Sequence, residues 1–349
     1  MSKGSLKHFP FFVKRFFNTE VMRTILLSIA LLLSGISTAS SNEVSLHQFI
    51  RGNWNRVDNN QWEYGIYDSV CIIQNRMCTT KSIKKQGECI ELVAQDRKNT
   101  TIITLLFTPQ PNGDCLIKAD GGNELLYTKK LSNNPLMTTE ADFEEVVRKD
   151  TAYLQGYIDR YDPESDTDNK LISIGNEITG EDCPIIVNIN PDGTFECKLA
   201  LSYPINNLLQ LGNHVTSFYI EPGQTLSIYI DYEGNYDRIK LMGPSTALSQ
   251  LYDKLRDLIK YPDEIFLKAK EGVAPERFKK EVQTTFSKYD QNRDSLIQIY
   301  ATSEKAVHLI KNKVALKKGI TLLNFALCRS MYAAKDTTNQ ALKAKEGND

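Results

Sequence analysis

The cysteines are the residues with the clearest chemical potential in this chain, and their spacing excludes the common thiol motifs. The 349 residues include seven cysteines, at positions 71, 78, 89, 115, 183, 197 and 328. No two have the Cys-x-x-Cys spacing that redox centres and zinc knuckles share. Because seven is odd, at least one thiol has no partner within the chain. The sequence therefore predicts no dithiol active site and no cofactor.

Cys71 and Cys78 are a candidate disulfide. If Gln74 and Asn75 form a two-residue turn, the flanking strands pair Cys71 with Cys78. Counting outward from the turn puts both at a hydrogen-bonded position, where the facing Cα atoms are farther apart than at the alternate position. Two interpretations stay open: a cross-strand disulfide, or two small buried thiols on one sheet face.

Other catalytic signatures are missing from the sequence. There is no Gly-x-Ser-x-Gly elbow, no His-Glu-x-x-His and no Gly-x4-Gly-Lys phosphate loop. His47, His214 and His308 are far apart, and none belongs to a ligand-spaced pair. We interpret each as a structural or surface residue, and we expect no catalytic, cofactor-binding or metal-binding residue in this chain.

The acids of "DPESDTD", which begins at Asp162, alternate as at the start of a calcium loop. Such a loop needs Gly at its sixth position and Glu at its twelfth, which here are Thr167 and Ser173. We therefore favour a solvated loop.

Trp54, Trp62, Tyr64 and Tyr67 form an aromatic group at strand spacing. These side chains could line a groove, but aromatic residues at such spacing more often pack in a core. The core interpretation is favoured.

Composition and charge are those of an ordinary globular protein. Hydrophobic residues make up 41% and charged residues 24% of the chain, and the length suffices for two or three domains. The formal net charge of -1 argues against nucleic-acid binding through overall charge.

An export signal is predicted near the N-terminus. In "MRTILLSIALLLSGISTASS", which begins at Met22, one Arg precedes an apolar run and small residues follow. The run is too short to span a bilayer, so we expect a cleaved signal peptide within residues 1–41 and a periplasmic protein without an integral membrane segment. The long, basic stretch before Met22 suggests that translation starts at Met22.

Two β-rich modules are predicted, over residues 42–137 and 138–243. Aromatic and β-branched runs alternate with turn residues, which is typical of sandwich-like sheets. Asn112-Gly113 and Asp192-Gly193 are hairpin signals. A short helix or connector is expected at residues 138–150.

The Asp192-Gly193 turn bears on a second cysteine pair. Across a hairpin with this turn, Cys197 faces Asn188, and Cys183 lies roughly 16 Å farther along the strand. We therefore expect no Cys183–Cys197 bridge.

The stretch "FYIEPGQTLSIYID" has the form of a turn followed by the closing strand of the second module. Pro222 and Gly223 suit the central positions of a turn, and Leu226 begins an apolar alternation. Glu221 alone is too little to indicate a site.

Residues 244–349 change to helical periodicity. Ser245 is a plausible N-cap for a first helix, and Pro275 begins a second. A third helix is expected over residues 303–334, with a break near Gly319. The predicted fold class is α+β: two β-rich, sandwich-like modules followed by an α-helical C-terminal region.

Four stretches carry a family resemblance: "DTAYLQGYIDRYDPESD", "GNEITGEDCPIIVNINPDGTFECKLALSYPI", "FYIEPGQTLSIYIDYEG" and "LMGPSTALSQLYDKL". In this order they resemble consecutive pieces of the exported, thioredoxin-like TlpA-like thiol-disulfide oxidoreductases common in gut Bacteroidota. The upstream stretch "IRGNWNRVDNNQWEYGIYDSV" also resembles the N-terminal strand module of these proteins, so the resemblance covers about Ile50 to Tyr332.

The resemblance implies a signal peptide, β-rich N-terminal modules, a helical connector and a C-terminal thioredoxin domain. A Trp-Cys-x-x-Cys-type motif in that last domain would supply the reactive thiolate. No position of this sequence matches the motif, and Cys328 has no second cysteine three residues on. We therefore expect the thioredoxin domain to be absent, and we carry over no catalytic residue.

Three functions follow as hypotheses. The leading one is a non-catalytic periplasmic protein with a binding, interaction or structural role, and with an unidentified protein or envelope partner. The second is a truncated or interrupted oxidoreductase whose catalytic domain lies outside this chain. The third is a carbohydrate- or peptide-binding β-sandwich that uses Trp54, Trp62 and neighbouring tyrosines.

Overall fold

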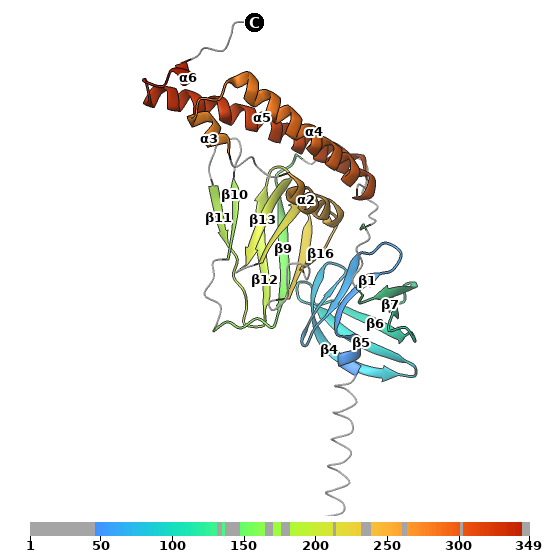
Figure 1. The fold of residues 1–349 in the computed structure, drawn as a ribbon. Coiled ribbons are helices and arrows are strands. Elements are labelled where there is room, and N and C mark those ends of the chain that lie inside the picture. The colour runs from blue at the N-terminus through green and yellow to red at the C-terminus, as the bar shows by residue number, and fades with distance from the viewer. Residues whose placement is uncertain are drawn as a thin grey trace, which may run out of the picture.

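The fold combines a β-barrel, a pair of facing β-sheets and a layer of helices, in that order along the chain (Figure 1). The computed structural model describes residues 46–130, 135–136, 147–164, 170–175, 182–211, 214–231, 239–259, 264–300 and 303–343. The predicted signal segment, residues 1–41, and most of the predicted connector at 138–150 lie outside the described residues.

The first β-rich module is a closed barrel, so the prediction of a sandwich was wrong for this module. Within residues 46–130, eight antiparallel strands follow one another around the barrel. The last strand pairs with the first, through Asn55 opposite Thr128 and Arg56 opposite Tyr127. Closure removes the two free edges that an open sheet would expose. The strands are β1 (Gly52–Arg56), β2 (Trp62–Ile66), β3 (Val70–Ile73), β4 (Arg76–Gln86), β5 (Cys89–Asp96), β6 (Ile102–Pro109), β7 (Cys115–Ala119) and β8 (Glu124–Thr128).

Side chains fill the interior of the barrel, as expected for one of this size. Strand β5 shows the alternation that produces this core, because Ile90, Leu92 and Ala94 are buried between half-buried neighbours. Trp54 is fully buried, and its indole N–H donates to the Ile50 carbonyl at 2.7 Å. Trp54 is therefore a core residue.

Two predicted hairpins of the barrel are confirmed. Gln74 and Asn75 join β3 to β4, with φ values of 46° and 66°. The resulting register sets Cys71 opposite Cys78. Asn112-Gly113 lies between the paired strands β6 and β7, and Gly113 has a φ of 85°.

The second module consists of two four-stranded sheets that share one core. Among the described residues, one sheet has the order β11-β10-β13-β14 and the other β12-β9-β15-β16. Ile172 and Phe218 of the first sheet belong to the same buried cluster as Leu199 and Ile228 of the second. The strands are β9 (Asp150–Asp159), β10 (Lys170–Gly175), β11 (Asp182–Ile186), β12 (Thr194–Leu201), β13 (Ile205–Leu211), β14 (His214–Ile220), β15 (Thr225–Asp231) and β16 (Ile239–Met242).

The hairpin predicted at Asp192-Gly193 is present only as a short reversal, in which Ile189 and Phe195 form an isolated antiparallel bridge and the Asn190 N–H donates to the Thr194 carbonyl at 2.8 Å. The strands on its two sides, β11 and β12, belong to opposite sheets, and β12 pairs with β9. The register of this reversal differs by one residue from the prediction, no ladder extends from it to Cys197, and Cys197 pairs with Leu154 of β9. The turn residues fix a local reversal of the chain, whereas packing against the shared core selects the strand partner.

The Pro222-Gly223 turn also crosses between the sheets. It follows β14 of one sheet and leads into β15 of the other, where Leu226, Ile228 and Ile230 are buried in the shared core. Gly223 has a φ of 83°, which a residue with a Cβ rarely adopts.

The described helices are α2 (Thr246–Leu258), α3 (Ile265–Lys270), α4 (Pro275–Tyr300), α5 (Glu304–Lys335) and α6 (Gln340–Lys343). Three of them, α2, α4 and α5, match the sequence signals, whereas α3 and α6 were not predicted. As predicted, α4 begins at Pro275, and Ser303 precedes α5, where its hydroxyl accepts the Ala306 N–H. The break predicted near Gly319 was wrong, because α5 stays packed on both sides of it through Val314 and Phe325.

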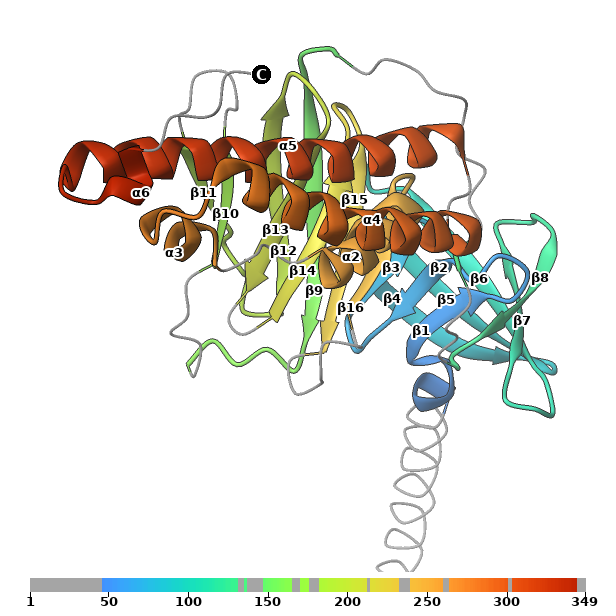
Figure 2. The ribbon, with the colours of Figure 1, turned by 45° about the horizontal axis from the view of Figure 1, so that its top comes forward.

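The helical layer attaches to the second module through α2. The backbone N–H of Tyr219, in β14, donates to the Ser249 hydroxyl at 2.8 Å, and the Tyr219 ring stacks on Tyr252. This contact covers an edge strand. Above it, α4 and α5 run side by side, with Phe278 stacked on Phe325 (Figure 2). Across the described residues, no helix has the length and apolar character needed to cross a membrane.

A stack of tyrosines fixes the barrel to the second module. Tyr67 of the barrel lies between Tyr157 of β9 and Tyr229 of β15, with ring centroids 4.3 and 5.1 Å away. The hydroxyls of Tyr157 and Tyr229 donate to the Asp159 carboxylate at 3.5 and 3.3 Å, and Arg51 donates to it at 2.9 Å. Burial raises the pKa of Tyr157 to about 12, so its hydroxyl stays a donor at neutral pH.

The β3–β4 turn adds a second connection between these parts. The Asn75 side-chain amide donates to the Thr225 carbonyl at 2.6 Å, and its oxygen accepts the Ser227 hydroxyl at 2.6 Å. The Asn75 carbonyl also accepts the Gln155 amide at 2.9 Å. A barrel turn is thereby tied into the hydrogen bonds of β9 and β15.

Substitution of Asn75 tests this junction. Asn75→Gly tolerates the positive φ but removes both carboxamide hydrogen bonds, so we expect the free energy of unfolding to fall by about 2 kcal/mol. Asn75→Ala should cost about 1 kcal/mol more, because alanine resists positive φ. Guanidinium denaturation followed by tryptophan fluorescence measures both. Gln74→Gly, at the exposed neighbouring turn position, is the control and should cost well under about 1 kcal/mol, because it removes only the long hydrogen bond to Tyr64. A loss equal to that of Asn75→Gly would contradict the assignment.

Candidate functional site

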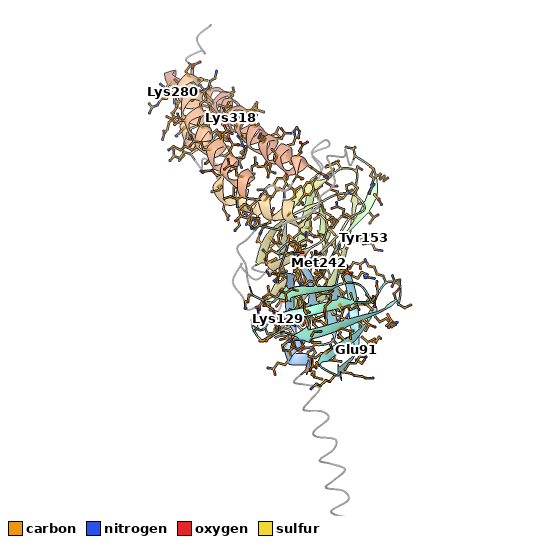
Figure 3. All side chains as sticks on the ribbon, turned by 90° about the vertical axis from the view of Figure 1, so that its right-hand side faces the viewer. Glu91, Lys129, Tyr153, Met242, Lys280 and Lys318 are labelled. Carbon is orange, nitrogen blue, oxygen red and sulfur yellow. The ribbon has the colours of Figure 1, made fainter. Side chains whose placement is uncertain are left out.

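A cleft of about 740 Å³ opens where the barrel, the second module and the start of α5 meet. We call it the central cleft. Its barrel side includes Glu63 and Tyr127, and its opposite side includes Glu221 and Lys305. Met242, labelled in Figure 3, also lines it at the junction of the barrel and the second module.

The barrel side of the cleft is a hydrogen-bonded group centred on Glu63 in β2. Its carboxylate accepts the Tyr127 hydroxyl at 2.6 Å and lies 3.6 Å from the Arg56 guanidinium. The rings of Tyr64 and Tyr127 meet edge to face at 5.0 Å, and Gln74 donates to the Tyr64 hydroxyl at 3.4 Å. Burial and the contact with Glu63 raise the pKa of Tyr127, which keeps this hydroxyl protonated.

The opposite side is organised around Glu221, at the end of β14. This buried carboxylate accepts the Tyr219 hydroxyl at 3.0 Å and the Gln224 amide at 3.3 Å, and it forms an ion pair with Lys305 in the first turn of α5. The Ser245 hydroxyl donates to Gln224 at 2.6 Å. The start of the last long helix is thus fixed at the cleft by a buried charge.

The charges of the lining balance. Arg56 and Lys305 offset Glu63 and Glu221, and both carboxylates have partners within the lining. No histidine or cysteine is among the described residues that line the cleft. The arrangement can therefore donate and accept hydrogen bonds to a polar ligand without a net charge of its own.

The structure brings together two of the four aromatic residues considered from the sequence. Trp62 and Tyr64 line the central cleft. Trp62 is only 3% exposed, and its indole N–H donates to the Tyr64 carbonyl at 2.9 Å. Trp54 lies inside the barrel and Tyr67 lies in the tyrosine stack, so neither reaches the cleft.

Sequence reasoning missed the main polar members of the site. Glu63 and Tyr127 are 64 positions apart, and only barrel closure brings β8 beside the first strands. Lys305 and Glu221 come from different layers. Glu221 was the one member that the sequence could have indicated, because it is an acidic residue between an apolar strand and Pro222.

The histidines lie in different parts of the fold. His47 contacts the Tyr67 carbonyl at 3.0 Å, and His308 contacts Asn312 on the same helix. His214 begins β14. Over the described ranges, no three metal-binding side chains gather. Most of the acidic loop that begins at Asp162 lies outside the described residues.

Cys71 and Cys78 face each other in the barrel core as free thiols, so their disulfide stays a prediction. The hydrogen bond with Cys71, together with burial, raises the pKa of Cys78. Burial also raises the pKa of Cys115 to about 12. Cys328 is half-buried against the helical core. Thiols with raised pKa are poor nucleophiles at neutral pH.

Comparison with protein-family models, with curated proteins and with solved structures found no match to this chain.

The ion pair at the cleft can be tested by removing its cation. Lys305→Met leaves the Glu221 charge buried, and we expect a loss of about 3 kcal/mol in the free energy of unfolding. The double variant Lys305→Met/Glu221→Gln should recover most of this loss, because no unpaired charge then remains. Lys311→Met, at an exposed position of the same helix, is the control. Urea denaturation measures all three, and equal effects of the two lysine variants would refute the pairing.

Proposed function

We propose that this chain is a non-catalytic binding protein of the periplasm and that its ligand is a neutral saccharide held in the central cleft. The observation that carries the proposal is the cleft itself. Its volume of about 740 Å³ lies within the usual range for small-molecule sites. The barrel, the second module and the helical layer all contribute to its lining, so the site requires the complete fold.

The polar groups of the lining support a saccharide over a charged ligand. Hydroxyl groups of a sugar both donate and accept hydrogen bonds, and they match carboxamides well. Gln61, Gln74, Asn123 and Gln224 supply four carboxamides to the lining, and Gln74 and Asn123 are exposed. Tyr64 and Tyr127 add aromatic edges. The balanced charges provide no surplus attraction for an anion or a cation.

The chemistry of the cysteines supports a non-catalytic role. The chain has no Cys-x-x-Cys, and the thiols of Cys78 and Cys115 have raised pKa values. The predicted export signal supports the periplasm.

Cleft-filling substitutions test the binding role. A glycan array would identify the sugar, and calorimetry would measure its affinity. We expect Gln61→Trp and Asn123→Trp to weaken binding at least tenfold, about 1.4 kcal/mol, because each indole occupies cleft volume. Gln283→Trp, at an exposed position of α4 outside the lining, should bind as the wild type does.

The outcomes separate the two parts of this proposal. One outcome is that no sugar on the array binds, but a peptide library yields ligands whose binding the cleft substitutions weaken. The binding role then stands and the saccharide assignment fails. If no ligand binds, or if the cleft substitutions leave binding unchanged, the central cleft is not the site.

The alternative of an interrupted oxidoreductase has its own test. We expect the purified chain to reduce insulin no faster than the dithiol reagent alone, because the two facing thiols, Cys71 and Cys78, are buried in the barrel core and out of reach of a protein disulfide. Substantial dithiol-dependent turnover would refute a non-catalytic role. The nucleotide sequence that follows the codon for Asp349 would then be read, in every frame, for a Trp-Cys-x-x-Cys motif.

A further inference from the structure

Helix α5 carries an apolar stripe on its outer face. Five large side chains on it are more than two-fifths exposed: Leu316 64%, Ile320 43%, Leu323 58%, Leu327 54% and Met331 57%. Their spacing of four, three, four and four residues keeps them on one line along the helix. We call this line the α5 stripe. The opposite face of α5, with Val314 and Phe325, is buried in the helical core. Figure 2 shows α5 running along the outside of the helical layer.

Beyond Lys317 and Lys318 at its start, the α5 stripe has no exposed charged residue of its own helix beside it. From Gly319 to Ala334 the one charged residue is Arg329, which is 7% exposed and donates to the Val273 and Ala341 carbonyls. The neighbouring helix α4, in contrast, exposes charged residues along its solvent face. Depletion of charge around large apolar side chains is the pattern of an interface centre, not of a solvated helix.

Gly319 adds an independent observation. A glycine inside a helix costs about 1 kcal/mol relative to alanine, and a Cβ at this position would meet no atom within 4 Å. Among the described residues, nothing therefore requires a glycine here. Gly319 and the exposed Ala326 and Ser330 form a row of small residues beside the stripe. Small side chains there let a second helix approach closely.

We propose that the α5 stripe packs against the α5 stripe of a second copy of this chain, with the two helices antiparallel. Centred near Leu323, this pairing sets Leu316 opposite Met331 and Ile320 opposite Leu327, so every large side chain meets another. Two such helices bury on the order of 1,000 Å² in total, which reaches the lower limit for a specific interface. The same surface serves both copies, as two-fold symmetry requires.

Charge favours the antiparallel direction. In a parallel pair, the lysine-rich stretches of both copies, from Lys311 to Lys318, would gather at the same end of the interface, and like charges at close range are unfavourable. In the antiparallel pair, the two stretches lie at opposite ends of the interface. The apolar side chains of the stripe cannot form ion pairs with a highly charged partner. They can pack against the same apolar side chains of a second copy along the whole stripe.

Light scattering after size exclusion tests the dimer. The protein purified after expression of the full-length chain should have the mass of a dimer, and Leu323→Glu and Leu327→Glu should each convert it to a monomer with unchanged circular dichroism. Both side chains are exposed, so neither change disturbs the core. Ile299→Glu, which places the same charge at a 57% exposed position of α4, is the matched control and should stay dimeric. A monomeric wild type would overturn the proposal, and so would a dimer that survives both stripe substitutions.

Cysteine cross-linking tests the direction. Leu323→Cys lies at the proposed two-fold axis and should form a disulfide with its own copy under mild oxidation. Leu316→Cys lies two turns from that axis in each copy and should not. The wild type, with its native Cys328, gives the background. Cross-linking at both positions would show a parallel pair and would overturn the antiparallel arrangement.

Discussion

The insertion of Tyr67 between Tyr157 and Tyr229 is the contact on which the arrangement of the two β-rich parts depends. It sets one aromatic ring of the barrel between two rings of a sheet, and Asp159 fixes the hydroxyls of both outer rings. Domains joined by small polar interfaces move relative to one another. Here Trp62 and Met242 extend the stack into a buried apolar cluster, which holds the barrel in one orientation.

The central cleft exists because of this junction. Its sides belong to separate hydrophobic cores, one inside the barrel and one between the two sheets, so its shape is defined only while those cores keep their relative positions. Polar contacts strengthen the junction away from the stack. Arg97 of the barrel reaches Asp192 at 3.1 Å and Thr194 at 3.2 Å. Burial opposes the charge of Asp192, but the hydrogen bonds from Thr194 and Arg97 outweigh it and lower its pKa.

The sequence was informative wherever a feature depends on neighbours in the chain. The Gln74-Asn75 turn correctly placed Cys71 opposite Cys78, because the register of a two-residue hairpin follows from the turn alone. Ser303 and Pro275 marked two helix starts for the same local reason. The closing of the barrel could not be predicted in this way, because β1 and β8 lie at opposite ends of the module.

The candidate site could not be predicted from the sequence either, because its residues come together through pairings across long sequence distances. The hairpin predicted at Asp192-Gly193 is limited to a single bridge, because the following strand pairs with β9, whose other neighbour is the parallel strand β15. Apolar alternation fits either partner, so the sequence pattern does not decide between them. The same applies to the cleft, because its carboxylates and their partners meet only after three layers have assembled.

Helix α5 links the central cleft to the proposed dimer interface. It runs unbroken from Glu304 to Lys335, with Lys305 at the cleft and Leu323 at the centre of the stripe. At the rise of an α-helix these two residues are about 27 Å apart along the axis. An antiparallel pair centred on Leu323 would therefore hold the two copies of Lys305 roughly 54 Å apart, one at each end of the paired helices. Dimerisation would then leave both clefts open and facing separate ligands, so that one assembly could bind two sites on an extended polymer at once, with the gain in avidity that such linkage gives.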